Sequence, residues 1–336
     1  MPPIVTVAGL TKHYQVAEKA PGLAGALAHF FRRRYKAVLA VKGITFAIEP
    51  GEIVGFLGPN GAGKTTVLKM LSGLVHPTAG TVRVADRVPF AREKQLLMSI
   101  TLVMGGKQQL IWDLPARDSY RINAAVYELD DATAATRVAA LASMLDMAAN
   151  LDKPVRKLSL GERMKAELIA ALLHHPKVLF LDEPTLGLDV NAQATIRTFL
   201  AEYCRSTGAT ILLTSHYMAD ITALCQRVLV IDQGVLRYDG SLAGIHERFA
   251  PYREVSIELA RPIDRAQLAG MGEIESLEGR SAKLLVDRSK LTQVVARVMG
   301  ELEVTDLTVS DPPIEQVIAK VFKDGATAAA APPAAP

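Results

Sequence analysis

Several features that mark special classes of protein are scarce or missing in this sequence. There are only 2 cysteines, Cys204 and Cys225, which excludes a disulfide scaffold and indicates a reducing compartment. The longest apolar runs, such as residues 178–181, are far shorter than the roughly 20 residues needed to cross a bilayer. The first residues do not form a basic segment followed by an apolar stretch, so no signal peptide is expected. If the protein helps to move anything across a membrane, another chain must form the path.

Charge of one sign is also not in excess. The formal net charge is +3, which is too small to indicate nucleic-acid binding. Apolar residues make up 49% of the 336 positions, which is enough for a sizeable core and excludes wholesale disorder. A chain of this length is expected to form about two domains.

The hydrophobic pattern changes near residue 250. Residues 4–245 alternate short apolar strands with longer helical stretches, which predicts an α/β fold with a mainly parallel sheet. After that point the order β-α-β-β-α-β indicates a small ferredoxin-like α+β domain. Its expected strands are 254–259, 273–277, 282–287 and 304–309, and its expected helices are 265–271 and 290–302. The predicted domains are therefore 1–245 and 246–323, with a last helix at 314–322 and a disordered Ala/Pro tail at 324–336.

One early segment, residues 19–36, combines apolar and basic positions. Leu23, Leu27, Phe30 and Phe31 recur at helical spacing, and arginines follow directly at 32–34. One interpretation is a short surface helix with a solvated basic end. The other is a patch that contacts anionic lipid headgroups or a membrane partner.

The strongest motif lies between a predicted strand at 52–57 and a predicted helix at 66–74. It satisfies the pattern G-x-x-x-x-G-K-[ST], in which glycines let backbone N–H groups approach phosphate oxygens. Lys64 is expected to reach the β- and γ-phosphates, and the Thr65 hydroxyl to ligate Mg²⁺. The predicted nucleotide-binding residues of this loop are Gly58, Pro59, Asn60, Gly61, Ala62, Gly63, Lys64, Thr65 and Thr66.

Two carboxylates follow the apolar run 178–181. A carboxylate at the carboxyl end of a central parallel strand lies beside the phosphate loop in such sheets. We therefore expect Asp182 to hold Mg²⁺, directly or through water, and Glu183 to polarise the attacking water. The alternative is that both simply end the strand.

Residues 158–163, with the sequence LSLGER, precede an amphipathic helix. Ser159 and Glu162 form a capping box, which by itself explains the serine. A helix start with Ser159 and Gly161 is also an anion-binding end, and it could face the γ-phosphate of a second nucleotide.

Together these motifs resemble the ATP-binding-cassette (ABC) ATPases over residues 4–245. LSLGER is similar to the family signature LSGGQ: Ser159 and Gly161 match, whereas Leu160 and Glu162 depart from it. EPTLGLD matches the catalytic glutamate and the D-loop, which makes Glu183 the general base and Asp189 the D-loop aspartate. His216, after the apolar strand 210–215, matches the switch histidine.

The resemblance implies a P-loop NTPase cassette with a RecA-like core and a helical subdomain at about 107–175. Tyr14 is similar to the aromatic residue that stacks on adenine, with core packing as the alternative. The family places a glutamine before the helical subdomain, and here that position falls on Gly106. Gln108 and Gln109 are the candidates to replace it, and Gln109 is retained as a nucleotide-site residue.

Segments 106–115 and 158–165 resemble the ATPase subunits of ABC-2-type exporters, near the viologen- and daunorubicin-exporter branches. This resemblance implies ATP and Mg²⁺ as cofactors and two MgATP bound in a dimer, which we expect to be a homodimer. It also implies a separate permease that holds the protein at the cytoplasmic face of the membrane, and no nucleic-acid partner. The alternatives are the ATPase of a polysaccharide exporter or of an importer, and a soluble non-transport ABC protein. Substrate and the role of the C-terminal domain are not determined by the sequence.

Overall fold

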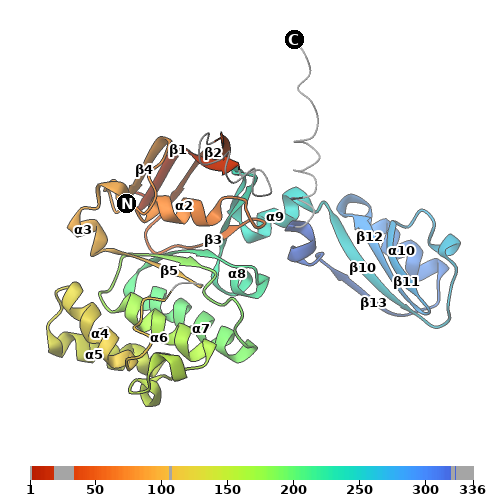
Figure 1. Ribbon diagram of the computed structural model, residues 1–336. Helices are drawn as coiled ribbons and strands as arrows, with labels where there is room; N and C mark the ends of the chain where they lie inside the picture. Colours follow the sequence, from red (N-terminus) through yellow and green to blue (C-terminus); the bar gives the residue numbers. More distant parts are fainter. Residues whose placement is uncertain (1, 19–33, 106–107, 319–321, 323–336) are drawn as a thin grey trace, which may run out of the picture. The chain divides into compact units, whose positions relative to one another are not determined.

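The computed structural model describes residues 2–18, 34–105, 108–318 and 322 (Figure 1). The chain divides into two compact units, residues 1–239 and 240–336, which are described separately.

A six-stranded sheet with the order β5-β6-β7-β3-β8-β9 forms the centre of the first unit. The pairs β5/β6, β6/β7, β3/β7 and β3/β8 are all parallel. Val178, Leu179, Phe180 and Leu181 of β6 are completely buried, as expected for a strand covered on both faces. The predicted parallel α/β core is therefore confirmed. The strands are β3 (Ile53–Leu57), β5 (Ile100–Met104), β6 (Val178–Asp182), β7 (Thr210–Thr214), β8 (Arg227–Asp232) and β9 (Val235–Ser241).

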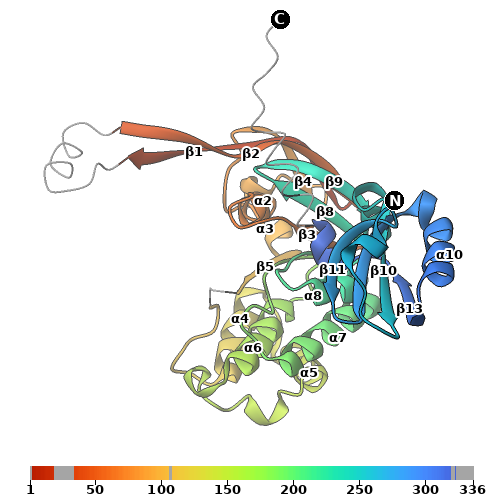
Figure 2. The ribbon, with the colours of Figure 1, turned by 90° about the vertical axis from the view of Figure 1, so that its right-hand side faces the viewer.

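A second, antiparallel sheet has the order β2-β1-β4 and consists of β1 (Val5–Glu18), β2 (Arg34–Ile48) and β4 (Ala79–Val84). Helix α2 (Lys64–Leu71) lies between this sheet and the parallel one, as Figures 1 and 2 show. Phe46 of β2, Phe56 of β3 and Leu68 of α2 meet in the shared core. Burial of each such side chain contributes about 1.5–3 kcal/mol, so this core fixes α2 against β3.

Beyond the core, β1 and β2 continue as a long two-stranded ribbon (Figure 2). Residues 19–33, which carry the proposed apolar and basic helix, lie outside the described residues. The end of that segment is described, and here the helical expectation is wrong: Lys36 belongs to β2 and pairs with Val16.

Two short helices, η1 (Pro89–Ala91) and α3 (Lys94–Leu97), precede β5 in the chain. The helices that follow β5 in the first unit are α4 (Ala116–Val126), α5 (Asp131–Met144), η2 (Ala148–Asn150), η3 (Val155–Lys157), α6 (Leu160–Leu172), α7 (Val190–Thr207) and α8 (Met218–Leu224). Tyr120 of α4 is buried and its hydroxyl donates to the carbonyl of Ala166 on α6, 3.1 Å away. This contact joins α4 to α6 in the helical part. Within the described ranges, no helix is both long and apolar enough to cross a membrane.

The second unit begins with α9 (Leu242–Phe249) and contains a four-stranded antiparallel sheet with the order β11-β12-β10-β13. Its elements are β10 (Tyr252–Leu259), η4 (Arg265–Leu268), β11 (Glu273–Glu278), β12 (Ser281–Asp287), η5 (Arg288–Lys290), α10 (Leu291–Glu301) and β13 (Val304–Ser310). This order and direction are those of the expected ferredoxin-like arrangement. One element is wrong, because the helix expected at 265–271 is only a short 3₁₀ turn.

The last predicted helix, 314–322, is helical at 314–318 and at 322, and Ile314 and Val317 are buried. The Ala/Pro tail lies outside the described residues.

Candidate active site

The loop between β3 and α2 surrounds a small cavity of about 160 Å³, lined by residues 60–66 together with Ala40 and Glu183. Gly61 and Gly63 have φ angles of +80° and +109°, which L side chains rarely adopt. A Cβ at Gly63 would lie 2.6 Å from the carbonyl oxygen of Ala40, so only glycine fits there. Gly63 caps α2, and the helix therefore begins at Lys64, two residues before its predicted start.

Lys64 is the buried cation of this loop, with 7% of the residue exposed. Its Nζ donates to the carbonyls of Gly58 and Pro59, 2.6 and 3.2 Å away. Burial lowers the pKa of Lys64, and the nearby carboxylates of Glu183 and Asp182 act in the opposite direction. The loop thus holds a poorly solvated ammonium group beside a cavity lined by backbone, which is an arrangement suited to an anion.

Asp182 lies at the carboxyl end of β6, directly opposite Thr214 of β7. The hydroxyl of Thr65 donates to Asp182 Oδ2 across 2.8 Å, and the hydroxyl of Thr214 donates to Oδ1 across 2.7 Å. The structure therefore brings together the two residues predicted to bind metal, although they are 117 positions apart in sequence.

Glu183 lines the same cavity and has a backbone φ of +56°, an uncommon value for a residue with a side chain. Its N–H donates to the carbonyl and the hydroxyl oxygens of Thr214, at 3.1 and 3.0 Å. Gly105 approaches from the other side, where a Cβ would lie 2.6 Å from the Glu183 carbonyl oxygen. His216 Nε2 is 2.8 Å from Glu183 Oε1, so the predicted acid–base residues form a pair.

The signature and D-loop residues form a separate group. Ser159 caps α6 and forms the predicted capping box with Glu162. Asp189 caps α7 by accepting from the N–H of Ala192, 2.9 Å away. A Cβ on Gly161 would lie 2.9 Å from Ala192 Cβ, so the two helix starts are in contact. None of these residues lines the phosphate-loop cavity.

Comparison with known sequences agrees with this geometry. The ABC transporter family model matches residues 41–186, and a model described as "EvrA-like ABC transporter, C-terminal domain" matches residues 251–310. The chain is 33% identical to the ABC transporter ATP-binding protein NatA of Bacillus subtilis, over 65% of this chain and 88% of that protein. It is also 33% identical to the Nod factor export ATP-binding protein I of Burkholderia pseudomallei, over 80% of this chain and 87% of that protein.

The chain belongs to the ABC transporter ATPases. The motif resemblance is therefore confirmed, and so is the expectation of an ATPase that binds nucleotide.

Solved structures share the fold of this ABC ATPase. An ATP-binding subunit of an ABC transporter gives a TM-score of 0.60 at 23% identity, covering 73% of this chain and 93% of that one. A dimeric ATP-binding cassette in a post-hydrolysis state, bound to ADP and Pi, gives a TM-score of 0.58 at 21% identity, covering 70% of this chain and 98% of that one.

Two further predicted site residues, Tyr14 and Gln109, also do not line the phosphate-loop cavity. Tyr14 lies on β1 opposite Val38, with Lys12 Nζ 5.2 Å from the centre of its ring. Gln109 Nε2 donates to the carbonyl of Leu102, 3.3 Å away, and Gln109 lines a different, larger cavity. Gly106, the position where the family has its glutamine, lies outside the described residues. The proposed roles of Tyr14 and Gln109 stay predictions.

Two buried carboxylates near the site were not identified from the sequence. Glu167 on α6 accepts from the backbone N–H groups of Gln109, at 3.0 Å, and Leu110, at 3.3 Å. Burial raises the pKa of Glu167, and these N–H donors oppose the shift. Asp220 on α8 is 1% exposed and is bonded to side chains on three other segments. Neither acid belongs to a motif, and an acidic residue inside an apolar helical pattern was the only available signal.

The contrast between Gly61 and Gly63 gives a test of the loop in the absence of nucleotide. Gly61→Ala is expected to lower the free energy of unfolding by about 1–2 kcal/mol through the positive φ alone, since nothing lies within 4 Å of its Cβ position. Gly63→Ala adds the collision with Ala40 and should cost about 1–3 kcal/mol more. Urea unfolding followed by circular dichroism measures both. Equal losses in the two variants would show that β2 does not confine the loop at Gly63.

Proposed function

We propose that this chain is the ATPase subunit of an ABC-2-type exporter, in which two copies bind two MgATP and drive a separate permease. The observation that carries the proposal is the division of the site residues into two groups. One group consists of the phosphate loop together with Asp182, Glu183 and His216, and the other consists of Ser159 and Gly161. A helix start such as that at Ser159 is an anion-binding end, and it is available to the nucleotide of a second copy.

The residues beside the cavity suit Mg²⁺, because Thr65 and Asp182 offer a hydroxyl and a carboxylate oxygen, the hard ligands that this ion prefers. When bound, Mg²⁺ supplies neutralisation of charge on the β- and γ-phosphate oxygens. Lys64 would exchange its carbonyl partners for phosphate oxygens, and Glu183 would accept a proton from the attacking water. His216 would hold the Glu183 carboxylate in place.

The larger cavity offers a place for the permease. It has a volume of about 640 Å³ and lies between β5, α3 and the end of α4, with Leu74 and Val126 on its wall. Val126 is 67% exposed, which is unusual for an apolar side chain on a helix, and Arg92 and Lys94 add positive charge. An amphipathic segment of a permease with an acidic residue would fit this lining. Such docking would place the protein at the cytoplasmic face of the membrane.

A pair of neighbouring substitutions tests the docking. The affinity-tagged chain is purified from detergent-solubilised membranes of its own cells, and the amount of permease recovered with it is measured. Val126→Asp should reduce this amount at least about tenfold, because it places a carboxylate in the apolar wall of the cavity. Ala125→Asp is the control, since Ala125 is also exposed on α4 but does not line the cavity. Equal recovery of the membrane partner with both variants, at equal unfolding midpoints, would count against this surface.

Export rests on the name of the Nod factor relative and on the motif resemblance. The neighbouring reading frames distinguish it from import. A companion with about six membrane spans and no solute-binding protein supports an exporter, whereas a binding-protein gene in the same cluster supports an importer.

A further inference from the structure

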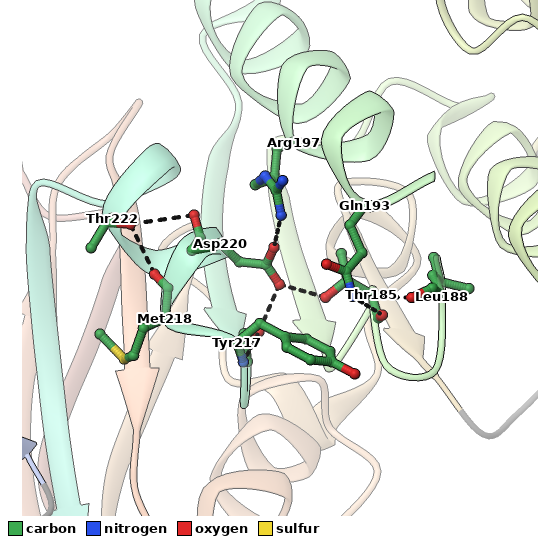
Figure 3. Close-up of polar contacts among 10 residues, drawn as sticks. Thr185, Leu188, Gln193, Arg197, Tyr217, Met218, Asp220 and Thr222 are labelled. Carbon is green, nitrogen blue, oxygen red and sulfur yellow. Dashed lines mark hydrogen bonds and ion pairs between the residues drawn. The ribbon is translucent and has the colours of Figure 1, made fainter. Parts of the chain in front are cut away.

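Asp220, a buried carboxylate on α8, lies at the centre of the polar cluster in Figure 3. Its Oδ1 accepts from Arg197 Nη1 of α7, 2.9 Å away, in an ion pair that is mostly buried. Its Oδ2 accepts from the hydroxyl of Ser215, at 2.7 Å, and from the hydroxyl of Thr185. One side chain therefore joins three separate segments of the ATPase unit.

The two hydroxyls belong to the segments that carry the acid–base pair. Thr185 lies two residues after Glu183, and Ser215 directly precedes His216. Ser215 Oγ also accepts from the N–H of Tyr217, 3.0 Å away, which fixes the turn on the other side of the histidine. Because both hydroxyls bond to the same oxygen of Asp220, the distance between these two segments depends on that carboxylate.

Helix α7 completes the cluster. Gln193 on this helix donates through Nε2 to the carbonyls of Thr185 and Leu188, at 3.5 and 3.2 Å (Figure 3). Leu188 directly precedes Asp189, the predicted D-loop aspartate. Arg197 lies one turn further along the same helix, so Asp220 and Gln193 together hold the chain between Glu183 and Asp189 against α7.

A carboxylate matches these partners in both hydrogen bonding and charge. Two hydroxyls and a guanidinium group present three donors, and both oxygens of Asp220 accept. An asparagine that accepts from Arg197 would have to donate to the two hydroxyls, which reverses the direction of both bonds and leaves the guanidinium without its counter-charge. Because the site is buried, a partner lost here is not replaced by water.

We propose that Asp220 is a positioning residue for ATP hydrolysis, which acts through Thr185 and Ser215 to hold Glu183 and His216 at their working separation. The inference rests on the roles proposed above for Glu183 and His216. Among the described residues, Asp220 forms no hydrogen bond or ion pair with a residue that lines the phosphate cavity, so its loss should change turnover and leave nucleotide binding intact.

Substitutions at Thr185 test the proposal with little change in shape. Thr185→Val removes the hydroxyl that donates to Asp220, and it is expected to lower kcat for ATP about tenfold with KM within twofold, because misplacement of reacting groups acts on the chemical step. Thr185→Ser keeps the hydroxyl and should retain most of the wild-type kcat. Rates are expressed per folded protein, measured by circular dichroism.

Asp220→Asn should have the larger effect, a loss of about 100-fold in kcat, again with an unchanged KM. Asp239→Asn is the matched control: Asp239 also accepts from an arginine, Arg227, at 2.8 and 3.0 Å, but it lies on β9 and not among the site residues. The control is expected to lower the thermal unfolding midpoint without changing kcat per folded protein.

The outcomes separate this inference from the proposed function. If Thr185→Val and Asp220→Asn lower only the unfolding midpoint, as Asp239→Asn does, Asp220 is purely structural and the inference is overturned. If Thr185→Ser loses as much turnover as Thr185→Val, the hydroxyl bond is not the cause and the inference also fails. Full turnover in Glu183→Gln would instead remove the general base and with it the proposed mechanism.

Discussion

Replacing Glu183 with glutamine is expected to lower kcat for ATP hydrolysis by about 100- to 10,000-fold, the usual contribution of general base catalysis. The amide keeps the size of the side chain but cannot accept a proton from water. The backbone at position 183 is bonded to Thr214 and confined by Gly105, so this segment should keep its shape in the variant. Single-turnover hydrolysis of radiolabelled ATP measures the loss.

The same variant tests the dimer. Because Glu183→Gln retains the phosphate loop and Lys64, it should bind MgATP with wild-type affinity and accumulate as a dimer in sedimentation velocity. Glu202→Gln on the exposed part of α7 is the control and should turn over ATP and dissociate normally. A variant that stays monomeric with saturating MgATP would contradict a composite site made from two copies.

Replacing Lys64 with alanine is expected to weaken ATP binding by about 10- to 100-fold, because hydrogen bonds to a charged group contribute about 1.5–3 kcal/mol. Among the residues that the structure describes, its Nζ is hydrogen-bonded only to the carbonyls of Gly58 and Pro59, and a phosphate is a stronger partner for a buried ammonium group. Equilibrium binding of a fluorescent ATP analogue with magnesium measures the change.

Lys69→Ala is the matched control for this second prediction. It removes a lysine from the last turn of the same helix, α2, far from the cavity-lining end. ATP affinity should then stay within about twofold of wild type, since Lys69 is half-buried and does not line the nucleotide cavity. Equal affinities in Lys64→Ala and wild type would mean that the ammonium group does not contact the nucleotide.

Local sequence was sufficient wherever the chemistry lies within one short segment. The phosphate loop needs glycine where a Cβ would collide with the backbone, as at Gly58, or where φ is positive, as at Gly63, and a helix must start directly afterwards at Lys64. The motif spacing contains both requirements. Ser159 and Glu162 form their capping box for the same reason, because a helix start is built from four consecutive residues. The buried strand 178–181 was recognisable from its continuous apolar run.

Predictions that depend on weaker local preferences were less accurate. Residues 265–271 have the spacing of a helix, but only 265–268 form a 3₁₀ turn, since Ala269 leaves the helical region and Gly270 follows with a positive φ. Lys36 was assigned to a helical segment and lies instead in β2, where pairing with β1 outweighs helical spacing. The spacing of apolar residues in a segment carries no information about the free energy gained when that segment pairs with a strand distant in sequence.

The sequence by itself determined the phosphate loop, the acidic pair at the carboxyl end of β6 and the order of alternating strands and helices, because each is a relation between near neighbours. Only the tertiary structure decided which strands lie side by side. Placing β7 between β3 and β6 brings Thr65 to Asp182 and His216 to Glu183, and no local signal specifies that order. The same is true of Asp220: it is an ordinary acid in the sequence, and it joins three segments because packing gathers Thr185, Arg197 and Ser215 around one buried carboxylate.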